Sequence, residues 1–216
     1  MTSKGNDTLF LVDGSGYTFR AYHSLPPLTR SDGTPVNAVL GFVIMLMKLI
    51  DDLADNEHLA VIFDTARKTF RNDIYQAYKA NRTAPPDDLI PQFQLIREAV
   101  EAFNIPAVSK QGYEADDLIA TYVRLGKLSD IRTVIVSSDK DLMQLIGPGT
   151  SMFDPSKNIE IGRAEVIKKF GVAPEKVVDV QSLAGDSVDN VPGVPGIGVK
   201  TAAILINEYE NLDTLL

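Results

Sequence analysis

Three short runs of apolar and β-branched residues, each followed closely by an aspartate, set the main limits on how this chain can fold. The runs and their aspartates are residues 8–12 with Asp13, residues 59–63 with Asp64, and residues 133–136 with Asp139. Helical patterns separate the runs, and a repeated strand-then-helix order predicts the α/β class, with a mainly parallel central sheet flanked by helices. Parallel strands end at one edge of a sheet, so the three aspartates are expected to lie together there.

The other expected elements follow from periodicity and from turn residues. Helices are expected after Asp13 through residue 22, over residues 36–53 and 89–103, from Glu114 onward, and over residues 163–170, 174–184 and 201–209. A further short strand is expected at residues 106–108, and the chain is expected to be helical beyond Phe153. With 216 residues and 44% hydrophobic content, the chain can form one core with a small appendage.

Further acidic residues can join the three aspartates at the sheet edge. The full set is Asp13, Asp64, Glu114, Asp116, Asp117, Asp139, Asp141, Asp186 and Asp189. Such a cluster is costly unless cations neutralise it, and oxygen ligands in an incomplete protein cage are how Mg²⁺ is usually held. A pair of divalent ions could activate a water and neutralise charge on a phosphodiester. A lone aspartate is more often a cap or turn residue, so the prediction depends on the joint pattern.

The net charge of −8 argues at first against a nucleic-acid partner, because phosphate binding usually leaves a basic footprint. Yet 29 acidic residues less these nine leave 20, against 21 lysines and arginines, so the rest of the chain carries about +1. Bound metal would turn part of the acidic patch into an anchor for phosphate. The acidity therefore does not exclude DNA or RNA.

Cysteine and membrane signals are absent from the sequence. Without cysteine there is no disulfide or thiolate metal site, and with His23 and His58 as the only histidines a zinc site is not expected. The longest apolar run, residues 39–50, includes Lys48 and is too short to span a bilayer. No signal-peptide pattern begins the chain. A cytoplasmic protein without membrane contact is expected.

Residues 65–88 mix basic and aromatic side chains with little apolar periodicity, so this segment is expected to project from the core. Lys79 and Arg82, at i and i+3, would share a helix face. Tyr78 could offer a stacking surface for an unpaired base. A solvated surface helix would carry the same charges, so the functional interpretation depends on the neighbouring motifs.

A glycine- and proline-rich segment at residues 185–201 forces a tight turn before the last long helix. Its glycines, Gly193, Gly196 and Gly198, could let backbone amides approach a nucleic-acid phosphate, with Lys200 and Thr201 at the following helix start. A nucleotide-binding loop is an alternative, but the prolines and the lack of a preceding strand do not fit it. A plain interhelical turn is the third interpretation.

Together these motifs resemble those of the flap-endonuclease family of 5′-nucleases, where they occur in the same order. They are Asp13-Gly14-Ser15, Phe63-Asp64, Tyr78-Lys79-Ala80-Asn81-Arg82, Glu114-Ala115-Asp116-Asp117, Ser138-Asp139-Lys140-Asp141 and Gly185-Asp186-Ser187-Val188-Asp189-Asn190. The match covers nearly the whole chain, and it is most similar to the N-terminal 5′→3′ exonuclease domain of bacterial DNA polymerase I.

The resemblance implies a PIN-like 5′-nuclease fold over residues 1–172, with a helical arch or clamp at residues 65–88. Residues 173–216 would form a helix-hairpin-helix, or helix-three-turn-helix, DNA-binding subdomain. Domains of this family usually continue through several more helices, so the subdomain is expected to be truncated at its C-terminus.

The resemblance also implies roles for single residues. Those matching Asp13, Asp64, Glu114 and Asp116 lie around one metal ion, those matching Asp139, Asp141, Asp186 and Asp189 serve a second, and Asp117 lies nearby. Residues matching Lys79 and Arg82 face the scissile phosphate from the arch, and Arg20 matches a basic position near it. The implied ions are two Mg²⁺, which Mn²⁺ can replace, and a K⁺ held by backbone carbonyls at the glycine-rich turn.

A member of this family would be a metal-dependent, structure-selective 5′ nuclease, a 5′→3′ exonuclease or flap endonuclease acting in primer removal and repair. Its expected partners are DNA with 5′ flaps, nicks or 5′ ends, and RNA primers. It is expected to be monomeric and to be joined to a polymerase domain in a longer parent chain.

Two other interpretations stay open. A PIN-type ribonuclease shares the acidic sheet edge but generally lacks the glycine-rich helical turn. A non-catalytic DNA-binding fragment would keep that turn without assembling the acidic site. Receiver-type and phosphatase folds also carry strand-end aspartates, but they explain neither the basic segment nor the turn.

Overall fold

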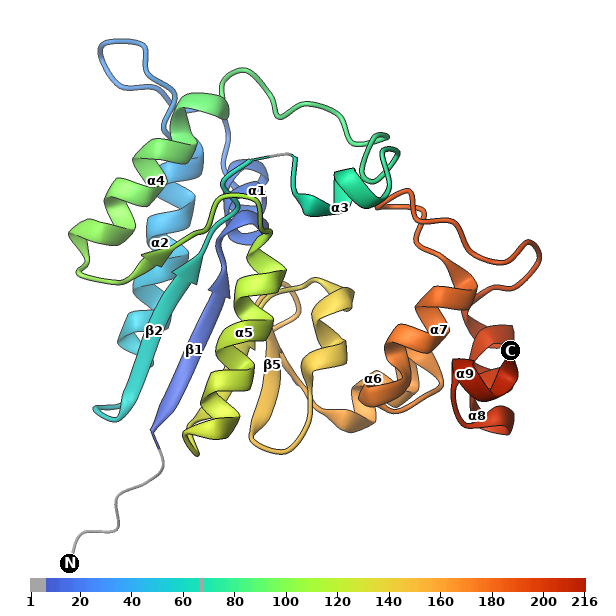
Figure 1. Cartoon of the computed structure of the whole chain (residues 1–216). Coiled ribbons are helices and arrows are strands. Elements are labelled where there is room, and N and C mark those ends of the chain that lie inside the picture. Colours follow the sequence, from blue (N-terminus) through green and yellow to red (C-terminus); the bar gives the residue numbers. More distant parts are fainter. Residues whose placement is uncertain (1–6, 67) are drawn as a thin grey trace, which may run out of the picture.

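A six-stranded sheet forms the middle of the computed structural model, which describes residues 7–66 and 68–216. Its strands are β1 (Thr8–Asp13), β2 (Glu57–Ile62), β3 (Ala107–Val108), β4 (Arg132–Val136), β5 (Thr150–Asp154) and β6 (Ile159–Ile161). They lie in the order β3-β2-β1-β4-β5-β6, and neighbouring strands are parallel except β5 and β6 (Figure 1). The predicted α/β class with a mainly parallel central sheet is confirmed.

Helices cover both faces of this sheet. They are α1 (Gly14–Ser24), α2 (Asn37–Asp51), α3 (Phe70–Ile74), α4 (Ile90–Ala102), α5 (Ala115–Leu128), α6 (Arg163–Phe170), α7 (Val177–Ala184), α8 (Val199–Tyr209) and α9 (Leu212–Leu215), with 3₁₀ helices η1 (Lys140–Leu145) and η2 (Pro174–Lys176). The helices α1, α2 and α4 lie against one face, and α5 lies against the other (Figure 1). The C-terminal helices α6 to α9 extend from the β5–β6 side.

Alternate side chains of the central strands enter two separate cores. In β1, Leu11 packs in the core that includes Ile119 of α5, whereas Val12 packs in the core that includes Phe42 of α2, and all four side chains are fully buried. Strands buried on both faces carry continuous apolar runs instead of an alternating pattern. The run at residues 8–12 therefore reflects burial on both faces of the sheet.

The expected strands at residues 8–12, 59–63, 106–108 and 133–136 are confirmed to within a residue or two. Beyond Phe153 the expected helices at residues 163–170 and 174–184 are confirmed. The expectation of helix is wrong for the residues before them, because β6 follows as the second arm of an antiparallel hairpin with β5. Only three residues form β6, and Ile159 and Glu160 are exposed. A short edge strand of this kind carries too little apolar pattern to stand out in the sequence.

The segment that was expected to form an arch leaves β2 and crosses above the strand ends (Figure 1). Its only helix among the described residues is α3, with five residues, and the chain from Tyr75 to Pro86 is in turns and irregular structure. Lys79 has a φ of 54°, in the left-handed region. The expectation that Lys79 and Arg82 share a helix face is therefore wrong. Residues 1–6 of the expected catalytic domain and Arg67 of the arch lie outside the described residues.

The C-terminal helices have the expected helix–turn–helix order. The glycine-rich segment, residues 185–198, connects α7 to α8, and these two helices pack against each other. None of the helices in the described part of the chain is long and apolar enough to cross a membrane.

Candidate metal and nucleic-acid site

Asp13 is fixed at the carboxyl end of the central strand β1. It caps the N-terminus of α1, where Gly16 donates its backbone N–H to Oδ1 at 2.9 Å. On its other side Ser137, just beyond β4, donates a hydroxyl hydrogen bond to Oδ2 at 2.8 Å. Burial raises the pKa of Asp13 above its ordinary value, and the neighbouring Asp139 and Asp64 add to the rise.

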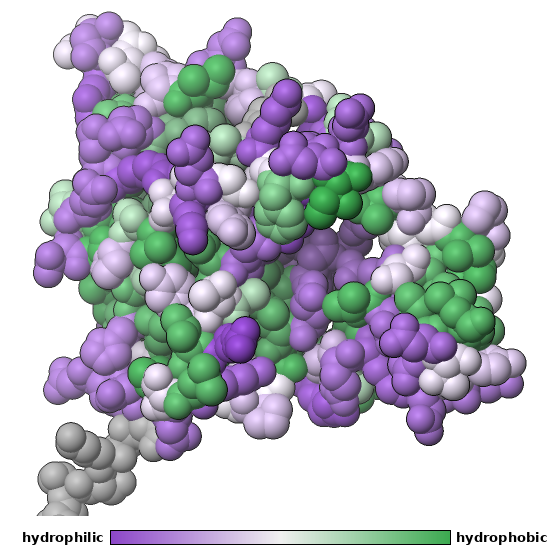
Figure 2. Space-filling view, in the orientation of Figure 1, coloured by the Kyte–Doolittle hydropathy of each residue, from purple (hydrophilic) through white to green (hydrophobic). Residues whose placement is uncertain are grey.

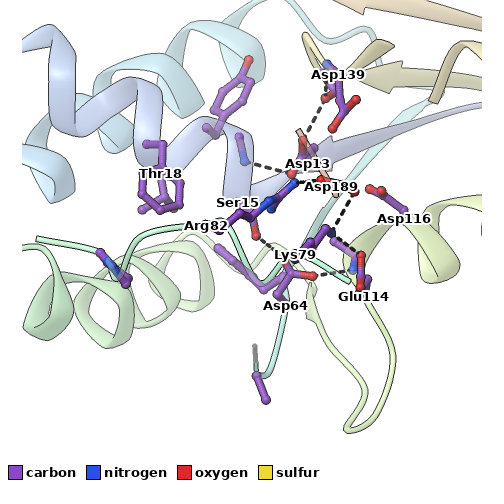
Figure 3. Close-up of a pocket in the computed structure, with 18 of the residues that line it drawn as sticks. Asp13, Ser15, Thr18, Asp64, Lys79, Arg82, Glu114, Asp116, Asp139 and Asp189 are labelled. Carbon is purple, nitrogen blue, oxygen red and sulfur yellow. Dashed lines mark hydrogen bonds and ion pairs between the residues drawn. The ribbon is translucent and has the colours of Figure 1, made fainter. Parts of the chain in front are cut away.

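Asp64 joins the end of β2 to the start of α5. Its Oδ1 accepts the backbone N–H of Ala115 at 2.7 Å, and its Oδ2 accepts the hydroxyl of Ser15 at 2.5 Å. Glu114 caps α5 and is 7% exposed. The end of β1, the end of β2 and the first turn of α5 therefore bring three predicted carboxylates to one edge of the sheet (Figure 3).

Asp116, in the first turn of α5, is buried close to other carboxylates. Burial, together with the nearby carboxylates of Asp13 and Asp139, raises its pKa to about 8 against the opposing effect of Lys79. A carboxyl group held near neutrality by its neighbours indicates that the site is short of positive charge.

Two basic side chains of the arch reach into the acidic edge. The Lys79 ammonium lies 2.6 Å from Oε2 of Glu114 and 3.6 Å from Oδ2 of Asp189, and Arg82 forms an ion pair with Asp189 (Figure 3). Burial opposes the charged form of Lys79, but the hydrogen bond to Glu114 raises its pKa on balance. The arch thus places two cations where the acidic cluster needs them.

Asp141 and Asp186 line the smaller, neighbouring cleft. The Lys140 ammonium is 2.6 Å from Oδ2 of Asp186, and Gln181 of α7 donates to Oδ1 of Asp141 at 2.5 Å. Burial raises the pKa of Asp141, with Asp139 adding to the rise. Burial alone would also raise the pKa of Asp186, but the hydrogen bond from Lys140 lowers it.

Asp117, in the first turn of α5, is bound to the arch through Arg71. Arg71 of α3 donates from both terminal nitrogens to the two oxygens of Asp117, each at 2.8 Å. These hydrogen bonds lower the pKa of Asp117 although burial alone would raise it. Both oxygens of Asp117 are thus engaged by Arg71 in this structure.

Two adjoining clefts collect these side chains. The larger, about 1140 Å³, lies under the arch and is lined by Asp13, Asp64, Glu114, Asp116, Asp139 and Asp189, together with Arg20, Tyr78, Lys79 and Arg82. The smaller, about 480 Å³, is lined by Asp117, Asp141 and Asp186. Glu114, Asp116 and Asp189 line both clefts. Figure 2 shows hydrophilic residues gathered in the hollow beneath the arch.

The carboxylates are suitable ligands for divalent metal ions, but in this structure their oxygens are not arranged around a common point. In the described part of the chain no three of its carboxylates and histidines already converge as a metal-binding group. Several of the oxygens are instead paired with lysine and arginine nitrogens. An all-oxygen, carboxylate-rich set that lacks positive charge at Asp116 suits Mg²⁺ or Mn²⁺.

Arg20 of α1 is a further basic residue of the larger cleft. One terminal nitrogen of its guanidinium group is buried without a hydrogen-bond partner. A buried donor of this kind is costly unless a ligand or water satisfies it. Arg20 is therefore available to an anion that enters the cleft.

The residues of the glycine-rich turn lie apart from the two clefts. Gly196, Gly198, Lys200 and Thr201 are exposed around the start of α8, for which Gly198 is the N-cap. Gly193 has a packing reason for being glycine, because a Cβ there would lie 2.5 Å from the carbonyl oxygen of Ala184. The part of the turn after Gly193 is thus largely exposed to solvent.

Sequence reasoning assigned no role to several polar residues that organise the site. Lys140, which pairs with Asp186, stands between two predicted ligands in the motif Ser-Asp-Lys-Asp. Arg71, which pairs with Asp117, is one of the basic residues of the segment 65–88. Ser15, which binds Asp64, belongs to the motif Asp13-Gly14-Ser15, and Ser137, which binds Asp13, directly precedes the motif that begins at Ser138. The position of these residues within or beside the acidic motifs is the feature of the sequence that could have identified them.

Two family descriptions match consecutive parts of the chain. Residues 8–171 match the 5′-3′ exonuclease, N-terminal resolvase-like domain, and residues 172–216 match the 5′-3′ exonuclease, C-terminal SAM fold.

Individual proteins are similar over almost the whole chain. DNA polymerase I of Rhizobium leguminosarum is 59% identical over 220 residues, which cover 99% of this chain and 22% of that protein. A 5′-3′ exonuclease of Aquifex aeolicus is 40% identical over 209 residues, which cover 97% of this chain and 72% of that protein. The solved structure of a T5 D15 flap endonuclease with DNA and metal ions shares the fold, with a TM-score of 0.77 at 23% identity, and the match covers 96% of this chain and 77% of that one. The chain thus spans about a fifth of the length of the Rhizobium relative.

Proposed function

Since the chain belongs to the 5′-3′ exonuclease family, we propose that it hydrolyses phosphodiesters at the 5′ ends and flaps of DNA in a metal-dependent reaction. The observation that carries this proposal is the pairing of two arch cations with the acidic edge, in which Lys79 lies 2.6 Å from Glu114 and Arg82 contacts Asp189. A strand that passes under the arch would meet positive charge on one side and the carboxylates on the other.

The carboxylates divide into two candidate metal sites. Asp13, Asp64, Glu114 and Asp116 would hold one ion, and Asp139, Asp141, Asp186 and Asp189 would hold the other. Bound Mg²⁺, or Mn²⁺ in its place, would activate the attacking water and neutralise charge on the phosphate. Asp139 lines the larger cleft together with Asp13, so the two sites would adjoin there. Asp117 stays outside both sets because Arg71 engages it.

The basic residues of the larger cleft would bind and orient the phosphate. Lys79 and Arg82 would exchange their carboxylate partners for phosphate oxygens. Arg20 would donate a hydrogen bond to the phosphate from its buried terminal nitrogen that has no partner. Tyr78 has its hydroxyl group 3.1 Å from Glu114, which leaves its ring as a contact surface for a base.

The glycine-rich turn would hold the duplex next to the cut strand. Gly196, Gly198, Lys200 and Thr201 present exposed backbone and a helix N-terminus, which suits a phosphate. Gly193 would support this turn by close packing. A K⁺ ion bound by backbone carbonyls is part of the proposal for the same turn.

The wider setting is proposed from the relatives. Residues 1–172 would be the catalytic domain and residues 173–216 the DNA-binding subdomain, joined to a polymerase domain in the parent chain as in the Rhizobium relative. The substrates would be DNA with 5′ flaps, nicks or 5′ ends and RNA primers, met in the cytoplasm by a monomer. Both family matches favour this assignment over a PIN-type ribonuclease or a non-catalytic fragment.

A substrate panel tests the proposal. Labelled 5′-flap DNA, nicked DNA, single-stranded DNA and an RNA strand of the same sequence would be incubated with the chain in Mg²⁺. We expect cleavage near the flap junction and little cleavage of the RNA strand that is not paired with DNA. Lys79→Ala should lower kcat/KM on the flap by about 100-fold, because it removes a donor to the reacting phosphate.

Lys48→Ala is the matched control, since Lys48 is exposed on α2 and distant from the cleft. It should leave the rate unchanged. Preferred cleavage of RNA would support the ribonuclease interpretation, and salt-sensitive binding of DNA without any turnover would support the non-catalytic one.

A further inference from the structure

The arch touches the loop that carries Asp186 and Asp189, far from it in sequence. We call residues 77–82 the arch base and residues 186–190 the carboxylate loop. In Figure 1 the segment after α3 meets the loop after α7. The backbone N–H of Lys79 donates to the carbonyl of Asp189 at 2.9 Å, so the two segments are joined through their main chains as well as their charged side chains.

Two asparagines complete this contact from opposite sides. Asn81 of the arch base donates its side-chain amide to the carbonyl of Ser187 at 2.8 Å. Asn190 of the carboxylate loop donates its own amide to the carbonyl of Ala77 at 2.7 Å. Each segment thus contributes one asparagine that binds the backbone of the other. We call this pair the asparagine clamp.

Two residues at the contact have a left-handed backbone conformation. Lys79 and Asn190 both have positive φ values, 54° and 56°. Asparagine tolerates this region better than most residues, whereas for lysine it is uncommon. The left-handed turn at Lys79 directs its N–H to the carboxylate loop while its side chain reaches Glu114. The carboxylate loop is itself closed by paired backbone hydrogen bonds between Asp186 and Val191 at 2.9 and 2.7 Å.

The clamp differs in chemistry from the ion pairs beside it. The contacts of Lys79 and Arg82 with Glu114 and Asp189 are charged, so any phosphate or cation that enters the cleft competes with them. The hydrogen bonds of Asn81 and Asn190 are neutral and use backbone carbonyls as acceptors. They can persist while the charged partners are exchanged.

We propose that Asn81 and Asn190 are positioning residues that hold the arch base on the carboxylate loop, so that Lys79 and Arg82 stay over the cleft when their carboxylate partners change. The catalytic part of this proposal rests on the proposed function, whereas the mechanical part does not. The clamp also places the arch between the two clefts, because Tyr78 and Asp189 line both.

Limited trypsin digestion tests the mechanical part without any nuclease activity. Trypsin would cut after Lys79 and Arg82, within the arch base, and mass spectrometry would identify the two products. In the absence of metal and DNA, Asn81→Ala and Asn190→Gly should each increase the rate of these cuts about fivefold, as expected for one lost hydrogen bond. Glycine is chosen at position 190 because it keeps the positive φ.

Asn158→Gly is the matched control. Asn158 also has a positive φ, 54°, and it is exposed in the turn between β5 and β6. It should leave the rate of cutting in the arch base unchanged, and circular dichroism would verify that all three variants are folded. Equal rates for wild type, Asn81→Ala and Asn190→Gly would overturn the proposal.

Steady-state kinetics on 5′-flap DNA test the catalytic part. Both clamp variants should lower kcat about fivefold or more with little change in KM, because positioning acts on the reacting geometry. In a Lys79→Ala background, Asn81→Ala should have a much smaller effect, since the residue that it positions is gone. Unchanged kcat in variants with faster trypsin cleavage, or full additivity with Lys79→Ala, would overturn the positioning role. If the wild type shows no nuclease activity, the proposed function fails and the trypsin result alone decides the clamp.

Discussion

Carboxylates that look alike in the sequence differ in their pKa values because each has different neighbours. Arg71 lowers the pKa of Asp117 and Lys140 lowers that of Asp186, in both cases against burial. Asp116 lies between other carboxylates, and burial with their charges raises its pKa to about 8. A cation bound near Asp116 would relieve this repulsion.

Asp154, at the end of β5, allows a test of pH dependence that is separate from the proposed metal ligands. It is 1% exposed and accepts hydrogen bonds from Ser138 at 2.7 Å, from the Ser156 N–H at 2.9 Å and from Lys157 at 2.9 Å. Burial alone would raise its pKa, but the hydrogen bonds of Ser156, Ser138 and Lys157 lower it well below the usual range.

A depressed pKa in the folded state means that Asp154 stabilises the protein above the pKa of the unfolded chain, about 4, and that this stabilisation is lost as the pH falls further. Asp154→Asn should lower the free energy of unfolding by about 2 kcal/mol at about pH 7, and by clearly less at about pH 3. Urea unfolding at both pH values measures the difference. Asp51→Asn, at an exposed site, is the control, and an equal loss at both pH values would contradict the assignment.

At the scale of elements, the glycines of the glycine-rich segment differ in whether the surrounding structure leaves room for a side chain. A side chain at Gly193 would collide with the backbone of Ala184 and Gly185, whereas one at Gly198 would meet nothing within 4 Å. Gly193 therefore sets how closely the turn packs on the end of α7, and Gly198 leaves the start of α8 open.

These glycines give a paired prediction for stability. Gly193→Ala should lower the free energy of unfolding by about 1–3 kcal/mol or more, because backbone atoms must move. Gly198→Ala should cost less than about 1 kcal/mol, the usual effect of alanine at an N-cap. Thermal unfolding of the two variants compares them directly. A smaller loss for Gly193→Ala than for Gly198→Ala would refute the packing argument.

The elements that sequence predicts well are those that bury apolar residues in regular patterns. The strands at residues 8–12 and 133–136, and the helix after Glu114, have strong apolar runs and clear caps. The hairpin of β5 and β6 escapes prediction because β6 is a three-residue edge strand with two exposed residues, which leaves too short a pattern to identify. The turn at Lys79 was taken for helix because its conformation depends on contacts with residues near position 189, which local pattern cannot reveal.

At the scale of the whole molecule, the site exists because three parts of the chain meet. The sheet edge supplies Asp13 and Asp64, α5 supplies Glu114 and Asp116, and the arch and carboxylate loop close over them. Strand ends on a parallel sheet made the first two groups predictable. The pairing of Lys79 with Glu114 and the clamp through Asn81 join residues up to 106 positions apart, and they could be found only in the folded structure.

An assembled site of this kind predicts that divalent cations stabilise the whole fold. Mg²⁺ in excess over its dissociation constant should raise the free energy of unfolding by about 1–3 kcal/mol, since it binds the folded chain only. Differential scanning fluorimetry with a Mg²⁺ titration measures the shift in Tm. NaCl at matched ionic strength is the control, and Asp116→Asn should reduce the shift. An equal rise in Tm with NaCl would mean that screening, not binding, is responsible.

The central claim is that the acidic edge beneath the arch cleaves DNA at 5′ flaps with the help of divalent metal. The most direct measurement is the length of the products from a 5′-labelled flap substrate, incubated with this chain in Mg²⁺ or in EDTA, beside Asp116→Asn. We predict short labelled products from the flap in Mg²⁺, none in EDTA, and a loss of at least about 100-fold in rate for Asp116→Asn. Equal cleavage in EDTA, or an Asp116→Asn variant as active as the wild type, would contradict the account.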